Sequence, residues 1–547
     1  MLAWLRQYRR AQLPGDISAG IVVAMMMIPQ GMAYAMVAGL PPVAGLYASI
    51  VPPVLYALFG SSMTQSIGPM AITSLMTASV LAPLAAPGSG LYMVLAAQLA
   101  LLSGAVLLVC GLLRIGFLAN FFSRPVMNGF TLGSSIVIAL GQGNALLGGV
   151  FPHVHLHSAV LGVGAVALLL LARRFLAPGL RLLGMPAAAA DVGARLAPML
   201  LVIGATALSY LFDFGALGVH TTGAVPSGLP GLNLATSASH WRVLVQPALL
   251  IGFMVFLISM SGAQTLALKR SEKLHSNHEL LGLGAANIGA ALTGGFPVTG
   301  SLSRSAVNFA AGANTQLASL ITAALLALAL VAPTGWLALL PLPVLAATII
   351  VAVLGMLDLD TLRTAWRYDR ADALALLATA GGVLAMGVES GVIIGLMLSM
   401  GAIIWRASRP HIAVLGRIAG TEHFRNITRY AAGTTPELLM LRIDAGLFFA
   451  NVLPVRARID EELAAHPATR DLVLVLSAVN AIDTSALFGL MELNTMLKGR
   501  NIGLHLAEVK GPVMDRLKHS SLLAALNGQV FLSTAMAADA LNPPGAH

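Results

Sequence analysis

Long apolar segments follow one another through the first three quarters of this chain and constrain its fold more than any other feature. A helix that crosses the hydrocarbon core of a bilayer needs about 20 predominantly apolar residues, and 57% of the 547 residues are hydrophobic whereas 10% are charged. The chain therefore predicts an α-helical multi-pass membrane protein. We place about fourteen transmembrane segments, at 17–37, 42–60, 66–83, 91–113, 126–147, 158–177, 195–212, 245–268, 279–296, 301–312, 315–332, 339–356, 371–387 and 390–406.

Two of these segments are short and interrupted by glycine or proline. One begins at Ser66 and the other at Ser301, and each is the third segment in its set of seven. Interrupted helices at matching places in two halves are typical of inverted-repeat transporters, which bind substrate between them. We therefore expect two inverted repeats of seven segments.

Residues 294–308, GGFPVTGSLSRSAVN, indicate a binding site. Glycine and proline end one helix there, and serines open the next with Arg304 in its first turn. The N-terminus of a helix favours an anion, because its free N–H groups carry roughly +0.5 charge. An arginine at mid-bilayer costs about 2.5–3.5 kcal/mol on insertion scales, so packing alone is a poor reason to keep one. Two alternatives stay open, a cytoplasmic serine-rich turn and an arginine that snorkels to the cytoplasmic face.

The distribution of basic residues predicts the topology. Lysine and arginine gather in cytoplasmic connections, so we expect an inner-membrane protein with both termini in the cytoplasm. The net charge of +9 follows from these loops and does not indicate nucleic-acid binding. The basic residues of these connections are Arg114, Arg124, Arg173, Arg174, Arg181, Arg195, Lys269, Arg270, Lys273, Arg363, Arg367 and Arg370.

Changes in composition divide the chain into four parts. We expect a short amphipathic cytoplasmic N-terminus at 1–15, a transmembrane transport domain at 16–409 and a linker at 410–435. From 436 to 547 strand and helix patterns alternate, which predicts a small cytoplasmic α/β domain. The single cysteine, Cys110, excludes an intramolecular disulfide.

Several motifs in the same order resemble the SulP anion transporters, also called solute carrier family 26. IPQGMAYAMVAGLPPVAGLYAS at 28–49 is similar to their first two helices, and SIGPMAITSLM at 66–76 to the broken third. Residues 277–308 resemble the ninth and tenth helices, and NAIDTSALFGL at 480–490 resembles the STAS domain that these transporters carry. The resemblance implies a core domain that rocks against a gate domain, a homodimer, and an anion held between the two half-helices.

Carried onto this sequence, the resemblance places the substrate at residues from three helices. Gln30 can donate two N–H bonds to an oxyanion, Tyr34 and Met70 form an apolar wall, and Arg304 supplies a permanent cation. Backbone N–H groups of the two half-helices add donors without charge. The predicted substrate-binding residues are Gln30, Tyr34, Gly68, Pro69, Met70, Ser301, Leu302, Ser303 and Arg304.

Two further positions follow from the resemblance. Bacterial relatives of the STAS domain phosphorylate a serine at the place of Ser485, which implies regulation there; the alternative is that Asp483 and Thr484 simply cap a helix. In the family the eighth helix often carries an acid that couples transport to a cation, but here Ile258 occupies that position. Transport would then be uncoupled, of the exchange type, or coupled to protonation elsewhere.

The preferred function is secondary transport of an inorganic oxyanion, sulfate first. The alternatives are a bicarbonate or dicarboxylate transporter, an anion exchanger or channel-like conductance, and a membrane-anchored regulator that acts through its STAS-like domain. The absence of a GxxxxGK[ST] motif argues against an ATP-driven pump. No catalytic constellation, cofactor motif or nucleic-acid patch is present, and His153, His155 and His157 lack the cysteine or acid that would favour a metal site. Expected partners are the anion, membrane lipid, a second copy and a cytoplasmic protein that binds the STAS-like domain.

Overall fold

The structure is a computed structural model that divides into two compact units, Met1–Ser399 and Met400–His547. Each unit is described by itself below. The described residues are 3–6, 8–117, 123–149, 154–187, 190, 193–194, 196–223, 226–231, 240–270, 272–332 and 334–542.

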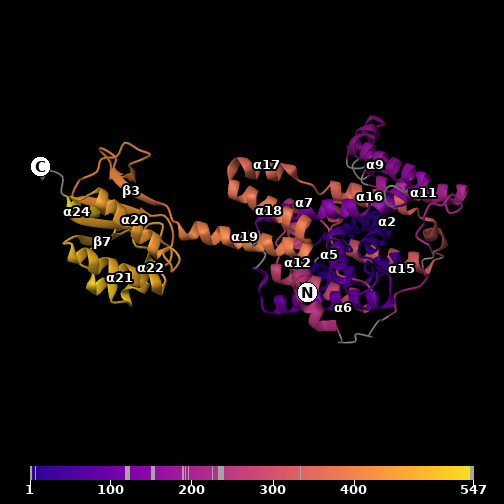
Figure 1. The fold of residues 1–547 in the computed structure, drawn as a ribbon, viewed down its shortest axis with the longest axis horizontal. Coiled ribbons are helices and arrows are strands. Elements are labelled where there is room, and N and C mark those ends of the chain that lie inside the picture. Colours follow the sequence, from indigo (N-terminus) through magenta and orange to yellow (C-terminus); the bar gives the residue numbers. More distant parts are fainter. Residues whose placement is uncertain are drawn as a thin grey trace. The chain divides into compact units, whose positions relative to one another are not determined.

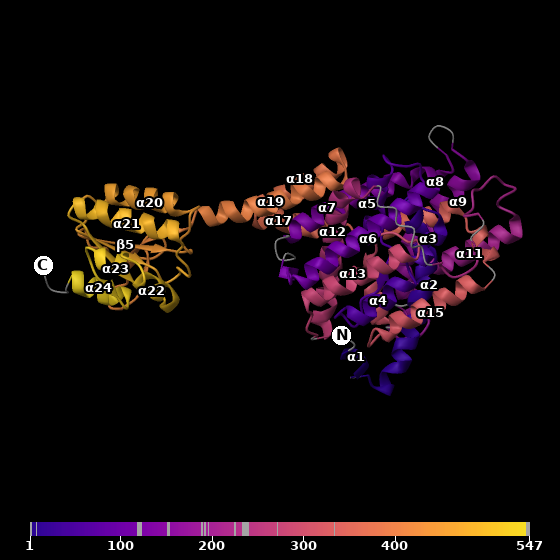
Figure 2. The same cartoon turned by 90° about the horizontal axis from the view of Figure 1, so that it is seen from below.

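The first unit is almost entirely helical (Figures 1 and 2). Each of the fourteen predicted apolar segments contains a described helix, and eight helices in the described part are long and apolar enough to cross a membrane. This confirms the multi-pass helical fold. The elements are α1 (Ala3–Arg6), η1 (Arg10–Gln12), α2 (Leu13–Val37), α3 (Pro42–Tyr47), α4 (Val51–Phe59), β1 (Ile67–Gly68), α5 (Ala71–Leu81), α6 (Gly90–Leu112), α7 (Arg124–Gly141), α8 (Gly143–Leu147), α9 (Leu156–Leu182), α11 (Ala197–Phe212), α12 (Trp241–Arg270), α13 (Ser276–Leu292), β2 (Thr299–Gly300), α14 (Leu302–Ala310), α15 (Leu317–Val331), η4 (Gly335–Leu339), α16 (Leu342–Leu354), α17 (Leu359–Tyr368), α18 (Arg370–Met386) and α19 (Val388–Ser408).

The two interrupted segments meet in the interior of this unit. Strands β1 and β2 pair antiparallel, with Ile67 opposite Gly300 and Gly68 opposite Thr299. All four of these residues are buried. Each strand leads directly into a short helix, α5 after β1 and α14 after β2. The third segments of the two halves are therefore joined backbone to backbone, as expected for paired broken helices.

Close approach of α2 to α3 depends on glycine. A Cβ atom on Gly45 would lie only 1.8 Å from the carbonyl oxygen of Gly31, because the two helices touch through their backbones there. Gly31 follows Gln30 directly and lies one turn before Tyr34 on α2. This contact therefore fixes the helix that carries two of the predicted substrate residues.

The second unit is an α/β fold with one six-stranded sheet of order β4-β3-β5-β6-β7-β8. Strands β5 to β8 run parallel, and β3 pairs antiparallel with both β4 and β5. Helices α20, α21, α22 and α23 pack on one face of the sheet and α24 on the other. The elements are β3 (Ile412–Arg417), β4 (Phe424–Asn426), β5 (Leu438–Ile443), α20 (Val452–Ala465), β6 (Asp471–Val475), α21 (Thr484–Gly499), β7 (Gly503–Ala507), α22 (Gly511–Lys518), α23 (Leu522–Ala525), β8 (Val530–Phe531) and α24 (Thr534–Leu541).

Part of the predicted linker at 410–435 is folded into this sheet. Its residues form β3 and β4, and Ala413 and Leu415 are buried in the core beneath α24. His411 Nδ1 also lies 2.8 Å from Asp444 Oδ2 at the end of β5. Burial raises the pKa of Asp444, but hydrogen bonds from Arg442 and His411 outweigh it and hold that pKa below its ordinary value. The sequence analysis missed these two strands because they are short, with six residues in β3 and three in the edge strand β4.

We expect Gly45→Ala to destabilise the first unit, because the new methyl group must push apart two backbones. Overpacking of this kind costs about 1–3 kcal/mol. Thermal unfolding in detergent measures the effect. The matched control is Gly164→Ala on α9, where a Cβ meets nothing within 4 Å. Equal melting temperatures for the two variants would contradict the close packing of α2 on α3.

Candidate functional site

Arg304 is the only arginine among the largest fully buried side chains of the described residues, with 1% of its surface exposed. Its Nε donates to Ser66 Oγ at 3.2 Å and its Nη1 donates to the carbonyl oxygen of Pro69 at 3.1 Å. Nη2 is buried and has no hydrogen-bond partner among the described residues. No described carboxylate forms an ion pair with the guanidinium. Arg304 therefore does not snorkel, and its charge is left without a protein counterion.

Hydrogen bonds connect the two half-helical segments, β1–α5 and β2–α14, beside Arg304. Ser66 N donates to Ser305 Oγ at 2.9 Å, and Ser301 N donates to the carbonyl oxygen of Ser66 at 3.2 Å. Ser301 Oγ caps α14 by accepting from Arg304 N at 3.4 Å. By contrast, the N-cap of α5, Met70, offers no side-chain acceptor to the first turn of its helix. No side chain therefore caps the first turn of α5, whose residues are buried.

The structure brings most of the predicted substrate residues together. Gly68 lies next to the free nitrogen, since a Cβ there would be 3.2 Å from Arg304 Nη2. Tyr34 is buried on α2 and close enough to Arg304 for an electrostatic interaction. Met70 is buried, whereas Leu302 and Ser303 are exposed.

Gln30 is the predicted residue with the least structural support. It is half-buried on α2 and forms no hydrogen bond within the described part of the chain. Its two amide N–H groups are thus unengaged by the protein, and its role in binding stays a prediction.

A buried carboxylate holds the loop that precedes β1, and sequence reasoning missed it. Glu279, at the start of α13, is fully buried and accepts four hydrogen bonds. The donors are Tyr56 Oη at 2.7 Å, Ser61 N at 2.8 Å, Ser61 Oγ at 2.7 Å and Ser62 N at 3.0 Å. These partners lie more than 200 positions away in the sequence, so no pattern of neighbouring residues indicates them.

Gln65 continues this polar chain toward α12. Its Nε2 donates to the carbonyl oxygen of Ser259 at 2.8 Å and also contacts the Ser259 hydroxyl at 2.6 Å. Its Oε1 lies 3.0 Å from the Tyr56 hydroxyl. The loop before β1 is therefore held from both α13 and α12. Ile258 packs against the apolar core, and its equivalence to the acidic position of the family stays a prediction.

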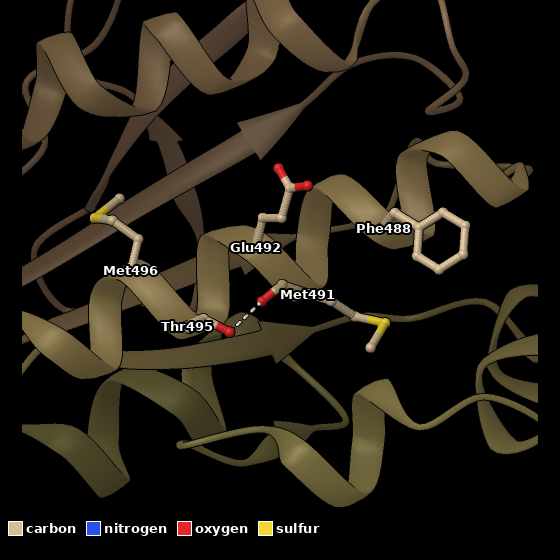
Figure 3. Close-up of a pocket in the computed structure, with 5 residues that line it drawn as sticks. All are labelled: Phe488, Met491, Glu492, Thr495 and Met496. Carbon is tan, nitrogen blue, oxygen red and sulfur yellow. Dashed lines mark hydrogen bonds between the residues drawn. The ribbon is translucent and has the colours of Figure 1, made fainter.

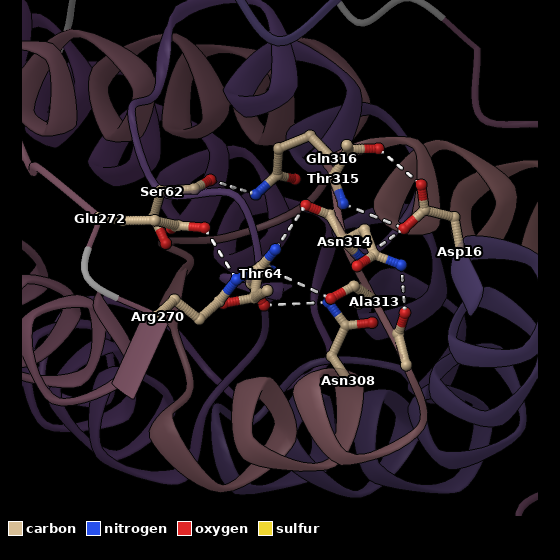
Figure 4. Close-up of polar contacts among 11 residues, drawn as sticks. Asp16, Ser62, Thr64, Arg270, Glu272, Asn308, Ala313, Asn314, Thr315 and Gln316 are labelled. Atoms are coloured by element: carbon tan, nitrogen blue, oxygen red, sulfur yellow. Dashed lines mark hydrogen bonds and ion pairs between the residues drawn. The ribbon is translucent and has the colours of Figure 1, made fainter. Parts of the chain in front are cut away.

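A second polar cluster holds the loop between α14 and α15 (Figure 4). Asp16, fully buried on α2, accepts from Asn314 N at 2.6 Å, Thr315 N at 3.0 Å and Thr315 Oγ1 at 2.7 Å. Arg270 donates to the carbonyl oxygens of Ala313 and Asn314 and pairs with Glu272 at 2.8 Å. The carboxylates of Asp16 and Glu272 therefore both have partners in the protein, whereas Arg304 Nη2 has none among the described residues.

Amide side chains tie this loop to the one before β1. Gln316 Nε2 donates to the carbonyl oxygen of Ser62 at 2.7 Å, and Asn308 Nδ2 donates to that of Thr64 at 2.9 Å. These contacts are also visible in Figure 4. Hydrogen bonds therefore connect the loop before β1 with α14 and with the loop that follows α14.

The loop histidines have an ordinary structural role where they are described. His155 Nδ1 caps α9 by accepting from Ser158 N at 3.4 Å, and His153 lies outside the described residues. Within the described ranges no group of three His, Cys, Asp or Glu side chains is placed to hold a metal ion.

Comparison with known proteins now identifies the family. The model of the sulfate permease family matches residues 13–379, and that of the STAS domain matches residues 429–537. The chain belongs to the sulfate permease family.

Relatives of known name agree with this assignment along nearly the whole chain. The probable sulfate transporter MT1781 of Mycobacterium tuberculosis is 38% identical over 539 residues, which cover 95% of this chain and 93% of the relative. Sulfate transporter 4.1, chloroplastic, of Arabidopsis thaliana is 35% identical and covers 96% of this chain and 80% of its own. The solved structure of SLC26A9 has the same fold, with a TM-score of 0.88 at 21% identity over 100% of this chain and 93% of that one. The resemblance seen in the sequence motifs is confirmed.

Ser485 lies in the STAS domain at the start of α21 and is exposed. Asp483 caps this helix by accepting from Ala486 N at 2.8 Å, and it also accepts from Phe449 N at 2.8 Å. Farther along α21 an open surface pocket is lined by Phe488, Met491, Glu492, Thr495 and Met496 (Figure 3). Asp483 is therefore the cap, and the Ser485 hydroxyl is accessible for modification.

We expect Glu279→Gln to lower the melting temperature, because an amide NH2 would face N–H and O–H donors that need an acceptor. Leaving a buried donor unsatisfied costs about 1–3 kcal/mol. Thermal unfolding in detergent measures this. Glu389→Gln is the control, since that half-buried side chain forms no hydrogen bond among the described residues. A Glu279 variant as stable as the control would show that the four hydrogen bonds do not hold the loop before β1.

Proposed function

We propose that this protein is a secondary transporter that moves a small inorganic oxyanion, sulfate first, across the inner membrane by alternating access. The observation that carries the proposal is the buried guanidinium of Arg304, whose Nη2 has no hydrogen-bond partner and which has no carboxylate partner in the part of the chain that the structure describes. A buried charge without a partner is costly in a protein. An anion bound between the half-helices offsets that cost.

The charge of the site fits a divalent anion. Two helix N-termini of about +0.5 each, together with Arg304, sum to about +2. Two of the relatives named above are a probable sulfate transporter and sulfate transporter 4.1, and sulfate is divalent. Bicarbonate and dicarboxylates are the competing substrates. Bicarbonate differs from sulfate in both shape and charge, whereas a dicarboxylate has the same charge and differs in shape.

Our proposal for the mode of coupling depends on the composition of α12, which contains no aspartate or glutamate. Ile258 takes the place of the coupling acid, and the buried carboxylates Asp16 and Glu279 are each engaged by several donors. We therefore favour exchange or uncoupled transport over proton symport through a buried acid. A channel-like conductance would instead give currents far above carrier turnover.

The arrangement in the membrane and the partners belong to the same proposal. The loop charges support N- and C-termini on the cytoplasmic side, which puts the STAS domain in the cytoplasm. The family resemblance supports a homodimer. We assign the protein no enzymatic activity, cofactor or nucleic-acid partner, and the exposed face of α21 is the surface offered to a cytoplasmic protein.

We expect Arg304→Ala to abolish saturable uptake of radiolabelled sulfate into proteoliposomes, because the site loses its only full positive charge. Arg304→Lys should retain weaker uptake, since a lysine keeps the charge but not the bonds to Ser66 and Pro69. Uptake is measured at two external pH values with bicarbonate, chloride and fumarate as competitors. Wild-type uptake by Arg304→Ala would refute the site, and failure of sulfate to enter or compete in the wild type would move bicarbonate or a dicarboxylate to first place.

We expect Ser485→Glu to change the maximal rate of uptake and to leave the KM for sulfate unaltered. A negative charge at the start of α21 mimics a phosphate, and the proposed anion site contains no residue of this unit. Ser485→Ala should behave as the unmodified protein. If both variants transport like the wild type, Ser485 has no regulatory role in transport and is only part of a capped helix.

A further inference from the structure

We propose that Met27 limits the size of the oxyanion that Arg304 binds, because its thioether methyl group occupies space beside the unpartnered nitrogen of that arginine. The inference rests on the proposed function and deepens it, since it concerns how the site selects among divalent oxyanions. Met27 is not one of the predicted substrate-binding residues, although it lies on α2 three residues before Gln30 and seven before Tyr34. Residues at this spacing share one face of a helix.

Gly68 shows how close Met27 lies to the unpartnered part of Arg304. A Cβ atom on Gly68 would lie 2.5 Å from Met27 Cε and 3.2 Å from Arg304 Nη2, so both atoms border the same small space. Nη2 is buried and has no hydrogen-bond partner among the described residues. Met27 is 1% exposed and belongs to the same apolar cluster as Tyr34 and Ala71, the first residue of α5. In this conformation a methyl group therefore fills space that an anion at Nη2 needs.

Met27 is the neighbour of Nη2 that can move away at the lowest cost. Because Nη2 is buried, an anion reaches it only after a neighbouring group has moved. Ser66 and Pro69 are held by their hydrogen bonds to the guanidinium, whereas the Met27 side chain is held by apolar packing. Methionine is unbranched and flexible, and it adapts to irregular gaps. We therefore assign the movement to Met27.

A methyl group beside the anion discriminates by size and not by charge. Sulfate, selenate and molybdate are all tetrahedral and divalent, and their size increases in that order. A thioether that stays next to the site leaves room for the smallest of them. Steric exclusion of this kind changes discrimination by about 10- to 200-fold for a single methylene. Truncation of Met27 removes the restriction and leaves the charge of the site unchanged.

The test measures the preference for sulfate over molybdate in the purified full-length protein at neutral pH. Wild type is compared with Met27→Ala, which removes most of the side chain, and with Met27→Leu, which conserves its volume. Met32→Ala is the matched control, because Met32 is also a fully buried methionine of α2 and of the same apolar cluster. Inhibition of sulfate uptake by molybdate gives one measure of preference. The shift in melting temperature with each anion gives a second that does not depend on transport.

We expect Met27→Ala to reduce the preference for sulfate over molybdate about tenfold, because the larger anion then fits beside Arg304. Met27→Leu and Met32→Ala should retain the wild-type preference. An unchanged preference in Met27→Ala overturns the inference, and so does a wild type that prefers neither anion. An equal loss in Met32→Ala also overturns it, since any cavity along α2 would then have the same effect.

A second measurement tests the contact between Met27 and Gly68 without any anion. Gly68→Ala should lower the melting temperature of the otherwise wild-type protein, because the new Cβ meets Met27 Cε at 2.5 Å. In the Met27→Ala background the same substitution should lower it less, since that contact is gone. An equal decrease in both backgrounds overturns the proposed contact. A wild type that binds sulfate in preference to molybdate but transports neither refutes the transport proposal alone, because the melting temperatures still report the size preference.

Discussion

The structure depends on the burial of Arg304 between two broken helices. A guanidinium so far from water requires hydrogen-bond acceptors, and the fold provides them from the opposite half of the protein, at Ser66 and Pro69. Antiparallel pairing of β1 with β2 brings these groups into reach. Its Nη2 has no hydrogen-bond partner among the described residues, and this separates Arg304 from the buried carboxylates Asp16 and Glu279.

The buried carboxylates show the contrast. Glu279 receives four hydrogen bonds and Asp16 three, so that each is satisfied without a ligand. They fix the loop before β1 and the loop after α14, which are also joined through Gln316 and Asn308. A half-helix site can retain a strained, partly unpaired charge only if its backbone is held in place. The two carboxylates supply that rigidity on either side of Arg304.

The STAS domain is stabilised mainly by two hydrophobic cores, one on each face of its sheet. Its sheet is built from alternating apolar residues that enter two cores, with four helices on one face and α24 on the other. Strands β3 and β4 extend the sheet at one edge. Ser485 and the pocket on α21 lie on the exposed surface of this unit, where modification or a partner can act without disturbing either core.

The sequence by itself determined the membrane class, the apolar segments and the two interruptions, because hydrophobic length and glycine or proline breaks are local properties. Together with the family resemblance it also predicted one substrate site, which stays a prediction, at Gln30, Tyr34, Gly68, Pro69, Met70, Ser301, Leu302, Ser303 and Arg304. Only the tertiary structure decided that Arg304 is buried and bound by Ser66, that Glu279 and Asp16 hold the flanking loops, and that residues 412–426 belong to the sheet. These depend on partners up to about 300 positions apart. A pattern of neighbouring residues does not indicate which distant group will form hydrogen bonds with a buried charge.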